Sequence, residues 1–442
     1  MVEMKEEKKG LNIGVKSFIT AIVVIFILMV ATYGLTFIVP GAYMPFWKWA
    51  LSPFLVLGSE GNGSLIAVLI FLLVIGGVFN CLEKCGLMIY MLENITERFG
   101  KERYKLLAYV TLFFMAMGSF IGSFEECVPL VPIMIALAIR LGWDALVGIG
   151  MSLLAIGCGF AAGVCNPFTV GVAQELAGLP MFSGIWFRLV SFVLVYALLM
   201  AFLLGYAKKI EKPLDEKQVF VTATDPKMDR ALKWFLGLMG GGILLVLSSV
   251  FITFLQDLTM IIVAVMFLSA GLVSCALTKR CGNMALTFWN GMVTIFPAVF
   301  MILMANSIKY TLVEGNVLDT LLQGAIAIAG TLPSWAVILF IYLIVLVMNF
   351  FISSGSAKAF LLMPLIVPVA QAFGISAQLC IVAFAFGDGF SNVIYPTNAV
   401  LLIALGVTGV DYGKWLKWSL PFQLLNLLLT SGLLLLGYVI GY

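Results

Sequence analysis

The sequence predicts an all-α polytopic membrane protein with about nine transmembrane helices and two re-entrant helical hairpins, arranged as two inverted-topology repeats. The first observation is composition: of 442 residues, 62% are hydrophobic and 11% are charged, whereas soluble domains carry about 25% charged residues. The second is a series of apolar runs long enough to span a bilayer. The third is the placement of the few charges, which form no basic stripe and so exclude nucleic acid as a partner.

The first half of the chain is expected to supply one helix and the first repeat. Residues 1–63 are predicted to form an N-terminal transmembrane helix and an outer loop, because the polar start lacks the features of a signal peptide. Residues 64–206 are predicted to form repeat 1, with a hairpin over 105–141 and a broken helix over 145–179. At about 1.5 Å per residue the hairpin arms are too short for a ~30 Å hydrocarbon core, so the hairpin is predicted to be re-entrant.

The second half repeats this plan after a polar connection. Residues 207–234 are predicted to form a cytoplasmic linker, and residues 235–278 two connecting helices. Residues 285–442 are predicted to form repeat 2, with a hairpin over 334–373 and a broken helix over 376–406.

The basic residues set the orientation. With both hairpins turning back, 21 of the 25 Lys and Arg residues fall on one side, which the positive-inside rule assigns to the cytoplasm. The N-terminus is then cytoplasmic and the C-terminus outside. If each hairpin crossed the membrane once, the linker with its seven basic residues would face outward, which the same rule disfavours.

Two recurring differences in residue number between similar positions, which we call shifts, indicate the internal repeat. Pro396 follows Pro167, and Trp415 follows Trp186, by 229 residues, while Pro364 follows Pro132 by 232. The first unit begins outside and the second inside, so the two are inverted. Inverted repeats with paired broken helices are typical of secondary transporters, whose binding sites lie at the breaks.

The charges left inside the membrane mark the candidate site, because each costs about 2.5–3.5 kcal/mol. They are Glu125, Glu126, Lys358 and Asp388. Three acids and one base favour a cationic ligand. A structural alternative pairs Lys358 with a glutamate of the other hairpin tip and places Asp388 at a helix cap or on the amides of Ser391 and Asn392.

Hydroxyl and amide residues gather at the first and second hairpin tips (122–126 and 353–358) and at the first and second breaks (163–169 and 391–398), where freed backbone groups suit a cation or an amino acid. The predicted substrate-binding residues are Ser123, Glu125, Glu126, Asn166, Thr169, Ser354, Ser356, Lys358, Asp388, Asn392, Thr397 and Asn398. Other polar features have simpler interpretations. The eight cysteines are expected to be small apolar fillers, and Trp415 a residue of the interfacial aromatic belt.

The motifs resemble a known family. Glu125-Glu126, Asn166-Pro167-Phe168, Ser354-Gly355-Ser356-Ala357-Lys358, Gly387-Asp388-Gly389 and Pro396-Thr397-Asn398 are similar to those of YfcC-type basic amino-acid antiporters, a group related to arginine/ornithine antiporters and anaerobic C4-dicarboxylate carriers. The resemblance implies a homodimer in the bacterial inner membrane that moves its substrate by an elevator motion. It implies no cofactor beyond Na⁺ or H⁺ as coupling ion, with Na⁺ near Ser123, Asn166, Ser356 and Asn398.

The resulting hypothesis is a secondary active transporter, and no enzyme, whose partners are a small-molecule substrate and the lipid bilayer. Basic amino acids such as arginine, ornithine and lysine are the expected substrates. A C4-dicarboxylate or another carboxylate, held by Lys358 and coupled to Na⁺ or H⁺, is the alternative. An intramembrane aspartyl hydrolase is a remote alternative, because its site needs two facing aspartates and Asp388 is the only aspartate well inside a membrane segment.

Overall fold

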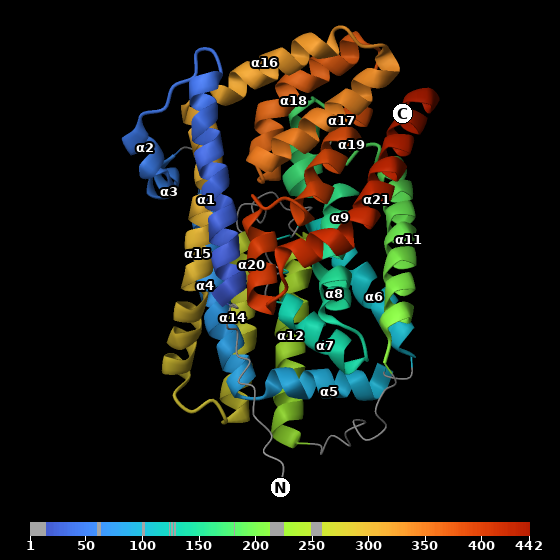
Figure 1. The fold of residues 1–442 in the computed structure, drawn as a ribbon. Helices are drawn as coiled ribbons and strands as arrows, with labels where there is room; N and C mark the ends of the chain where they lie inside the picture. The colour runs from blue at the N-terminus through green and yellow to red at the C-terminus, as the bar shows by residue number, and fades with distance from the viewer. Residues whose placement is uncertain are drawn as a thin grey trace.

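The computed structural model describes residues 15–59, 63–99, 102–122, 124, 127, 130–180, 182–212, 225–248 and 259–442. Every regular element within these ranges is helical, which confirms the all-α prediction. Long helices stand side by side through the height of the molecule, and shorter helices lie across its two ends (Figure 1).

One side of the molecule is a bundle that we call the scaffold bundle. It consists of α1 (Val15–Ile38), α4 (Gly63–Lys84), α12 (Pro226–Ser248), α14 (Thr259–Thr278) and α15 (Met284–Glu314). Short helices α2 (Phe46–Ala50) and α3 (Ser52–Leu55) and the turn η1 (Val56–Gly58) follow α1. Helices α4 and α15 approach closely, because a Cβ on Gly291 would lie 2.3 Å from the carbonyl oxygen of Gly76.

Two surface helices lead from the scaffold bundle to the two hairpins, at opposite ends of the molecule (Figure 1). At one end α5 (Leu87–Phe99) leads to α6 (Arg103–Ala116), which continues as the π-helical turn η3 (Met117–Ile121) and is followed by α7 (Val131–Arg140). At the other end α16 (Val317–Ala329) leads to α17 (Ser334–Phe351) and α18 (Gly355–Ala372).

Both stretches with predicted breaks contain interrupted helices. The first consists of α8 (Ala145–Ile149), η5 (Gly150–Leu154) and α9 (Ala155–Ala161), then the non-helical residues 162–166, then η6 (Pro167–Gly171) and α10 (Val172–Leu176). The second consists of α19 (Ala377–Gly389) and η8 (Phe390–Val393), then residues 394–398, then α20 (Ala399–Thr408). Long helices α11 (Ile185–Ile210) and α21 (Tyr412–Ile440) follow the two stretches.

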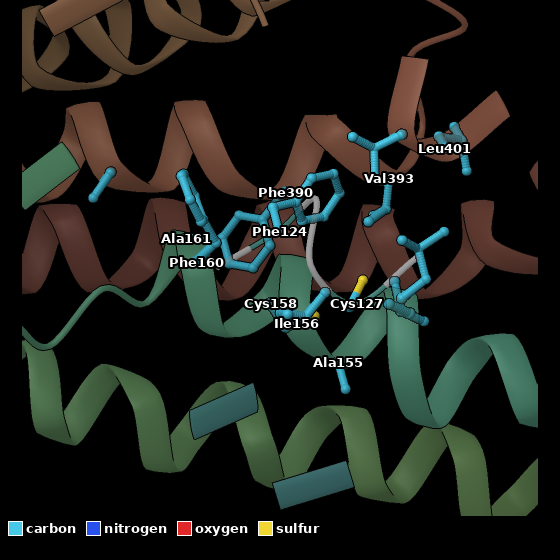
Figure 2. Packing of buried hydrophobic residues seen from close by; sticks show 14 of the residues in the cluster. Phe124, Cys127, Ala155, Ile156, Cys158, Phe160, Ala161, Phe390, Val393 and Leu401 are labelled. Carbon is cyan, nitrogen blue, oxygen red and sulfur yellow. The ribbon is translucent and has the colours of Figure 1, made fainter. Parts of the chain in front are cut away.

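The two interrupted helices cross at the centre of the molecule. A Cβ on Gly389 would lie 2.1 Å from the backbone nitrogen of Ala161, so only glycine permits this contact. Figure 2 shows the side chain of Phe124, a residue of the first hairpin tip, close to those of Phe160 and Phe390. The rings of Phe124 and Phe160 are 6.3 Å apart, edge to face. The first tip and both interrupted helices therefore share one core.

Within the described ranges, five helices are long and apolar enough to cross a membrane: α11, α15, α17, α18 and α21. A sixth span results if the bent pair 73–84 and 87–95 is counted as one. The count of about nine crossings, the re-entrant path of the hairpins and the repeat boundaries stay predictions.

Candidate functional site

At the second break, an asparagine side chain caps the helix that follows. Asn398 lies in extended conformation directly before α20, and its Oδ1 accepts hydrogen bonds from the backbone nitrogens of Val400 (3.0 Å) and Leu401 (3.3 Å). Its Nδ2 donates to Oδ1 of Asn392, at 3.0 Å. The first amides of a helix have no intrahelical acceptor, so this cap allows the helix to resume in a buried place.

The first break uses the same device. Asn166 Oδ1 accepts a hydrogen bond from the backbone nitrogen of Thr169, at 3.3 Å, again three residues further along the chain. Asn166 and Asn398 are 232 residues apart, which is one of the two shifts of the predicted repeat. A Cβ on Gly122, which has φ +77°, would lie 2.2 Å from Asn166 Oδ1, so the first tip packs directly on this cap.

The carbonyl groups freed at each break are bound by the long helix that follows. Arg188 of α11 donates from Nε to the carbonyl oxygen of Val164, at 3.1 Å, and Trp415 of α21 donates from Nε1 to that of Val393, at 2.8 Å. The two valines are 229 residues apart, the other shift of the repeat. Trp415 is therefore no belt residue: its side chain is fully buried because its N–H completes the second break. Arg188, which is not one of the 21 basic residues assigned to the cytoplasmic side, is also buried.

A buried ion pair lies beside the second break. Lys358 Nζ and Asp388 Oδ1 are 2.5 Å apart, and both side chains have no exposed surface. Lys358 is thus paired with Asp388 of the same predicted repeat; the glutamates of the other tip, with which the structural alternative paired it, lie outside the described residues. Each charge alone would be very costly at this depth, whereas the pair is neutral.

Asn349 of α17 joins this pair to the break. Its Oδ1 accepts a hydrogen bond from Lys358 Nζ, and its Nδ2 donates to the carbonyl oxygen of Asp388 (3.0 Å) and to Ser391 Oγ (2.6 Å). Asn349 is not among the residues predicted from the sequence. The only signal was an amide side chain inside an otherwise apolar hairpin arm, which is unusual because a buried amide needs partners.

Three buried polar atoms, one of the ion pair and one at each break, have no hydrogen-bond partner within the described part of the chain. They are Asp388 Oδ2, Thr169 Oγ1 and Thr397 Oγ1. A Cβ on Gly355 would lie 2.6 Å from Asp388 Oδ2 and 2.4 Å from Thr169 Cγ2, so the second tip brings Asp388 and Thr169 to the same glycine. Buried polar atoms normally have partners. Open acceptors of this kind suit a ligand that donates hydrogen bonds or carries positive charge.

The predicted site residues fall into three groups. Seven are buried at the crossing: Asn166, Thr169, Lys358, Asp388, Asn392, Thr397 and Asn398. Ser354 is exposed and caps α18 through a 3.4 Å bond from the amide of Ala357, and Ser356 is half-buried in the next turn. Ser123, Glu125 and Glu126 lie outside the described residues. The predicted excess of negative charge therefore depends on these two glutamates, because Lys358 and Asp388 neutralise each other.

The predicted Na⁺ ligands are partly engaged in other bonds. The two lone pairs of Asn398 Oδ1 already accept the amides of Val400 and Leu401. A Na⁺ ion at this oxygen would have to displace one of them. Among the described residues, the hydroxyls of Thr169 and Thr397 have no partner and could supply oxygen ligands.

Comparison with known proteins gives matches over most of the chain. The family model described as C4-dicarboxylate anaerobic carrier, DcuC, matches residues 51–439. A protein of Escherichia coli strain K12, described as "Putative basic amino acid antiporter YfcC", is 30% identical over 414 residues, covering 86% of this chain and 79% of that protein.

Two solved structures are similar. The Alcanivorax borkumensis YdaH transporter matches with a TM-score of 0.48 and 20% identity, covering 96% of this chain and 99% of that one. Neisseria gonorrhoeae MtrF, described as illuminating a class of antimetabolite efflux pumps, matches with a TM-score of 0.46 and 15% identity, covering 94% of each chain.

Proposed function

Since the chain belongs to the C4-dicarboxylate anaerobic carrier family of secondary transporters, we propose that it exchanges basic amino acids such as arginine, ornithine and lysine across a membrane. Family membership confirms the resemblance found in the motifs, and it also confirms that the chain is a carrier and not an enzyme. The hydrolase alternative is thereby removed.

One observation carries the choice of substrate. Asp388 is fully buried, with one carboxylate oxygen on Lys358 and the other without a partner among the described residues. An ionised carboxylate can accept hydrogen bonds at both oxygens, so the open one suits an ammonium or guanidinium group. The description of the Escherichia coli relative as a basic amino acid antiporter supports the same class.

The remaining substrate groups have candidate partners at the same place. The hydroxyls of Thr169 and Thr397 can donate to the α-carboxylate, and Glu125 and Glu126 of the first tip would add negative charge for a second cationic group. Substrate bound between the two tips would become accessible from either side as the tips and broken helices move against the scaffold bundle. We place the protein in the bacterial inner membrane as a homodimer, with a cytoplasmic N-terminus, an outside C-terminus and Na⁺ or H⁺ as the coupling ion where transport is not exchange.

Proteoliposomes test this directly. Vesicles loaded with unlabelled arginine or ornithine are expected to take up labelled arginine, ornithine or lysine, and uptake should stop when the internal amino acid is omitted. The Asp388→Asn/Lys358→Met double variant, which keeps the site neutral without its carboxylate, is the matched control. The proposal fails if no basic amino acid exchanges under any Na⁺ or H⁺ gradient.

A C4-dicarboxylate is the second candidate, favoured by the buried ammonium of Lys358 and by the family's own description. The variants Glu125→Gln and Glu126→Gln separate the two candidates. Exchange of a cationic substrate should collapse in both variants, because it loses negative charge at the tip. Exchange of a dicarboxylate should survive or improve, because a repulsive charge is removed.

A further inference from the structure

Four of the eight cysteines lie together at one end of the scaffold bundle. Cys81 is in the last turn of α4 and Cys85 directly follows it, Cys275 is in the last turn of α14, and Cys281 lies between α14 and α15. All four are free thiols and all are buried. These cysteines were expected to be apolar fillers, because the spacing of residues nearly 200 positions apart does not indicate that they meet.

One pair in this group has a close sulfur–sulfur contact, because Cys275 Sγ donates a hydrogen bond to Cys85 Sγ at 3.4 Å. The thiols also lie near backbone carbonyls: Cys85 near that of Leu82 (3.3 Å), Cys81 near that of Met284 (3.7 Å) and Cys281 near that of Cys81 (3.6 Å). No three Cys, Asp or Glu side chains among the described residues are arranged to hold a metal ion. The group therefore presents a thiol pair and not a metal centre.

The contact also makes Cys85 the nucleophilic partner. Cys85 Sγ accepts the hydrogen bond from Cys275, and a hydrogen bond to the charged form of a group favours that form. A thiolate, and not a thiol, attacks an oxidant. A disulfide requires the two sulfurs, now 3.4 Å apart, to approach by about 1.4 Å to a bond of about 2.05 Å.

The thiol pair lies beside the turn that leads from the scaffold bundle toward the first hairpin. Gly86, with φ +81°, forms the turn where α4 passes into α5, and α5 leads to the first hairpin. On its other side this turn packs on α12, where the hydroxyl of Tyr90 donates to Asp229. A bond from Cys85 to α14 would attach the turn covalently to the scaffold bundle.

We propose that Cys85 and Cys275 are an oxidant-sensitive thiol pair, which a hydroperoxide converts into a disulfide that joins α4 to α14 and restrains the turn into α5. With hydrogen peroxide, the Cys85 thiolate attacks one oxygen and breaks the O–O bond, giving a sulfenic acid and, with one proton, water. Cys275 then attacks the sulfenic sulfur, the S–O bond breaks, and a second water leaves with the thiol proton. Two thiols are oxidised, and one peroxide is reduced to two waters.

The cross-link itself is measured without any transport assay. The purified full-length protein is treated with hydrogen peroxide, remaining thiols are alkylated, and digested peptides are analysed by mass spectrometry. A peptide pair joining Cys85 to Cys275, two hydrogens lighter than its parts and separated by dithiothreitol, is expected. It should disappear in Cys85→Ser and Cys275→Ser and persist in the control Cys158→Ser/Cys380→Ser, which removes two buried thiols elsewhere.

Two results would overturn the thiol pair: formation of a Cys81–Cys281 bond in its place, or oxidation of Cys85 to higher acids without any bond to Cys275. Both are detected in the unmutated protein, so the test does not depend on how well the serine variants fold.

The effect on the turn is tested by exchange, and this part alone rests on the proposed function. Cross-linked protein is expected to exchange substrate severalfold more slowly, with recovery after dithiothreitol and no effect of peroxide on Cys85→Ser. Equal exchange before and after cross-linking would overturn the restraint. Absence of exchange in the reduced protein would instead contradict the proposed function and leave the thiol pair intact.

Discussion

The two breaks at the centre of the molecule share their backbone chemistry and differ in their charges. Each has an asparagine that caps the resuming helix, Asn166 or Asn398, and each has a carbonyl bound from the helix that follows, by Arg188 or Trp415. Only the second has a neutralised ion pair, Lys358 with Asp388, among the described residues around it. The shared features are those that any buried helix break requires, because freed backbone groups must be satisfied.

The difference therefore indicates where specificity lies. A side chain that caps the helix, or one that donates a hydrogen bond to a freed carbonyl, allows the helix to break inside the core. Neither determines which ligand binds. The described part of the first break has no such pair, so the cap and the bound carbonyl do not by themselves require one. We propose that the pair serves the ligand, so removing both charges together should separate folding from transport.

The largest effect is expected for Asp388→Asn. It leaves Lys358 buried without a countercharge, which costs about 3–5 kcal/mol, so the melting temperature should fall sharply and exchange should be lost. The double variant Asp388→Asn/Lys358→Met should regain most of the thermal stability while exchange stays absent. If the single variant and the parent protein have the same melting temperature, the ion pair does not form, and the two breaks do not differ in charge as described.

A smaller effect is expected for Gly355→Ala. The new methyl group would press on Thr169 and on the open oxygen of Asp388, at an overpacking cost of about 1–3 kcal/mol. Exchange should fall more than stability, because the methyl occupies the contact between the second tip and the first break. Gly324→Ala in α16 is the control, since no atom lies within 4 Å of its Cβ position. Equal exchange by both variants would show that the tips do not need to meet closely.

The shared half of the comparison is tested by Asn166→Ala and Asn398→Ala. Each removes a buried cap, and each is expected to cost about 0.5–2 kcal/mol of stability. Ser354→Ala removes an exposed cap with a long 3.4 Å bond, so its change in melting temperature should be smaller. A large loss in only one of the two asparagine variants would mean that the breaks are not built alike.

The smallest effect, a baseline for the others, is expected at the surface pair of Lys48 and Glu314. These side chains are 37% and 40% exposed and 3.3 Å apart, so Lys48→Gln should cost about 0–1 kcal/mol. Melting in low and high salt checks this, because screening should reduce even that small loss. A change comparable with that of the buried pair would place Lys48 in a less exposed environment than the structure gives it.

The sequence was informative for residues that disturb a helix locally and for charged residues, which are costly to bury in a membrane. Pro167, Pro396 and the neighbouring asparagines predicted the breaks because they disturb a helix directly, and Lys358 and Asp388 were selected because charge is expensive in a membrane. Asn349, Arg188 and Trp415 were missed or misplaced because their roles depend on which helix packs beside them. Cys85 and Cys275 were missed for the same reason.

The Lys358–Asp388 pair has an electrical consequence. Moving one elementary charge across a membrane potential of 100 mV takes about 2.3 kcal/mol, and a domain carrying an unpaired charge would bear that cost in every transport cycle. Since the net charge of the pair is zero, the pair contributes nothing to the voltage dependence of the step in which the substrate-free transporter returns to its starting conformation. Any current would then report the charge of the substrate, the coupling ion and the other charged groups that move with the breaks, such as Arg188 and the first-tip glutamates.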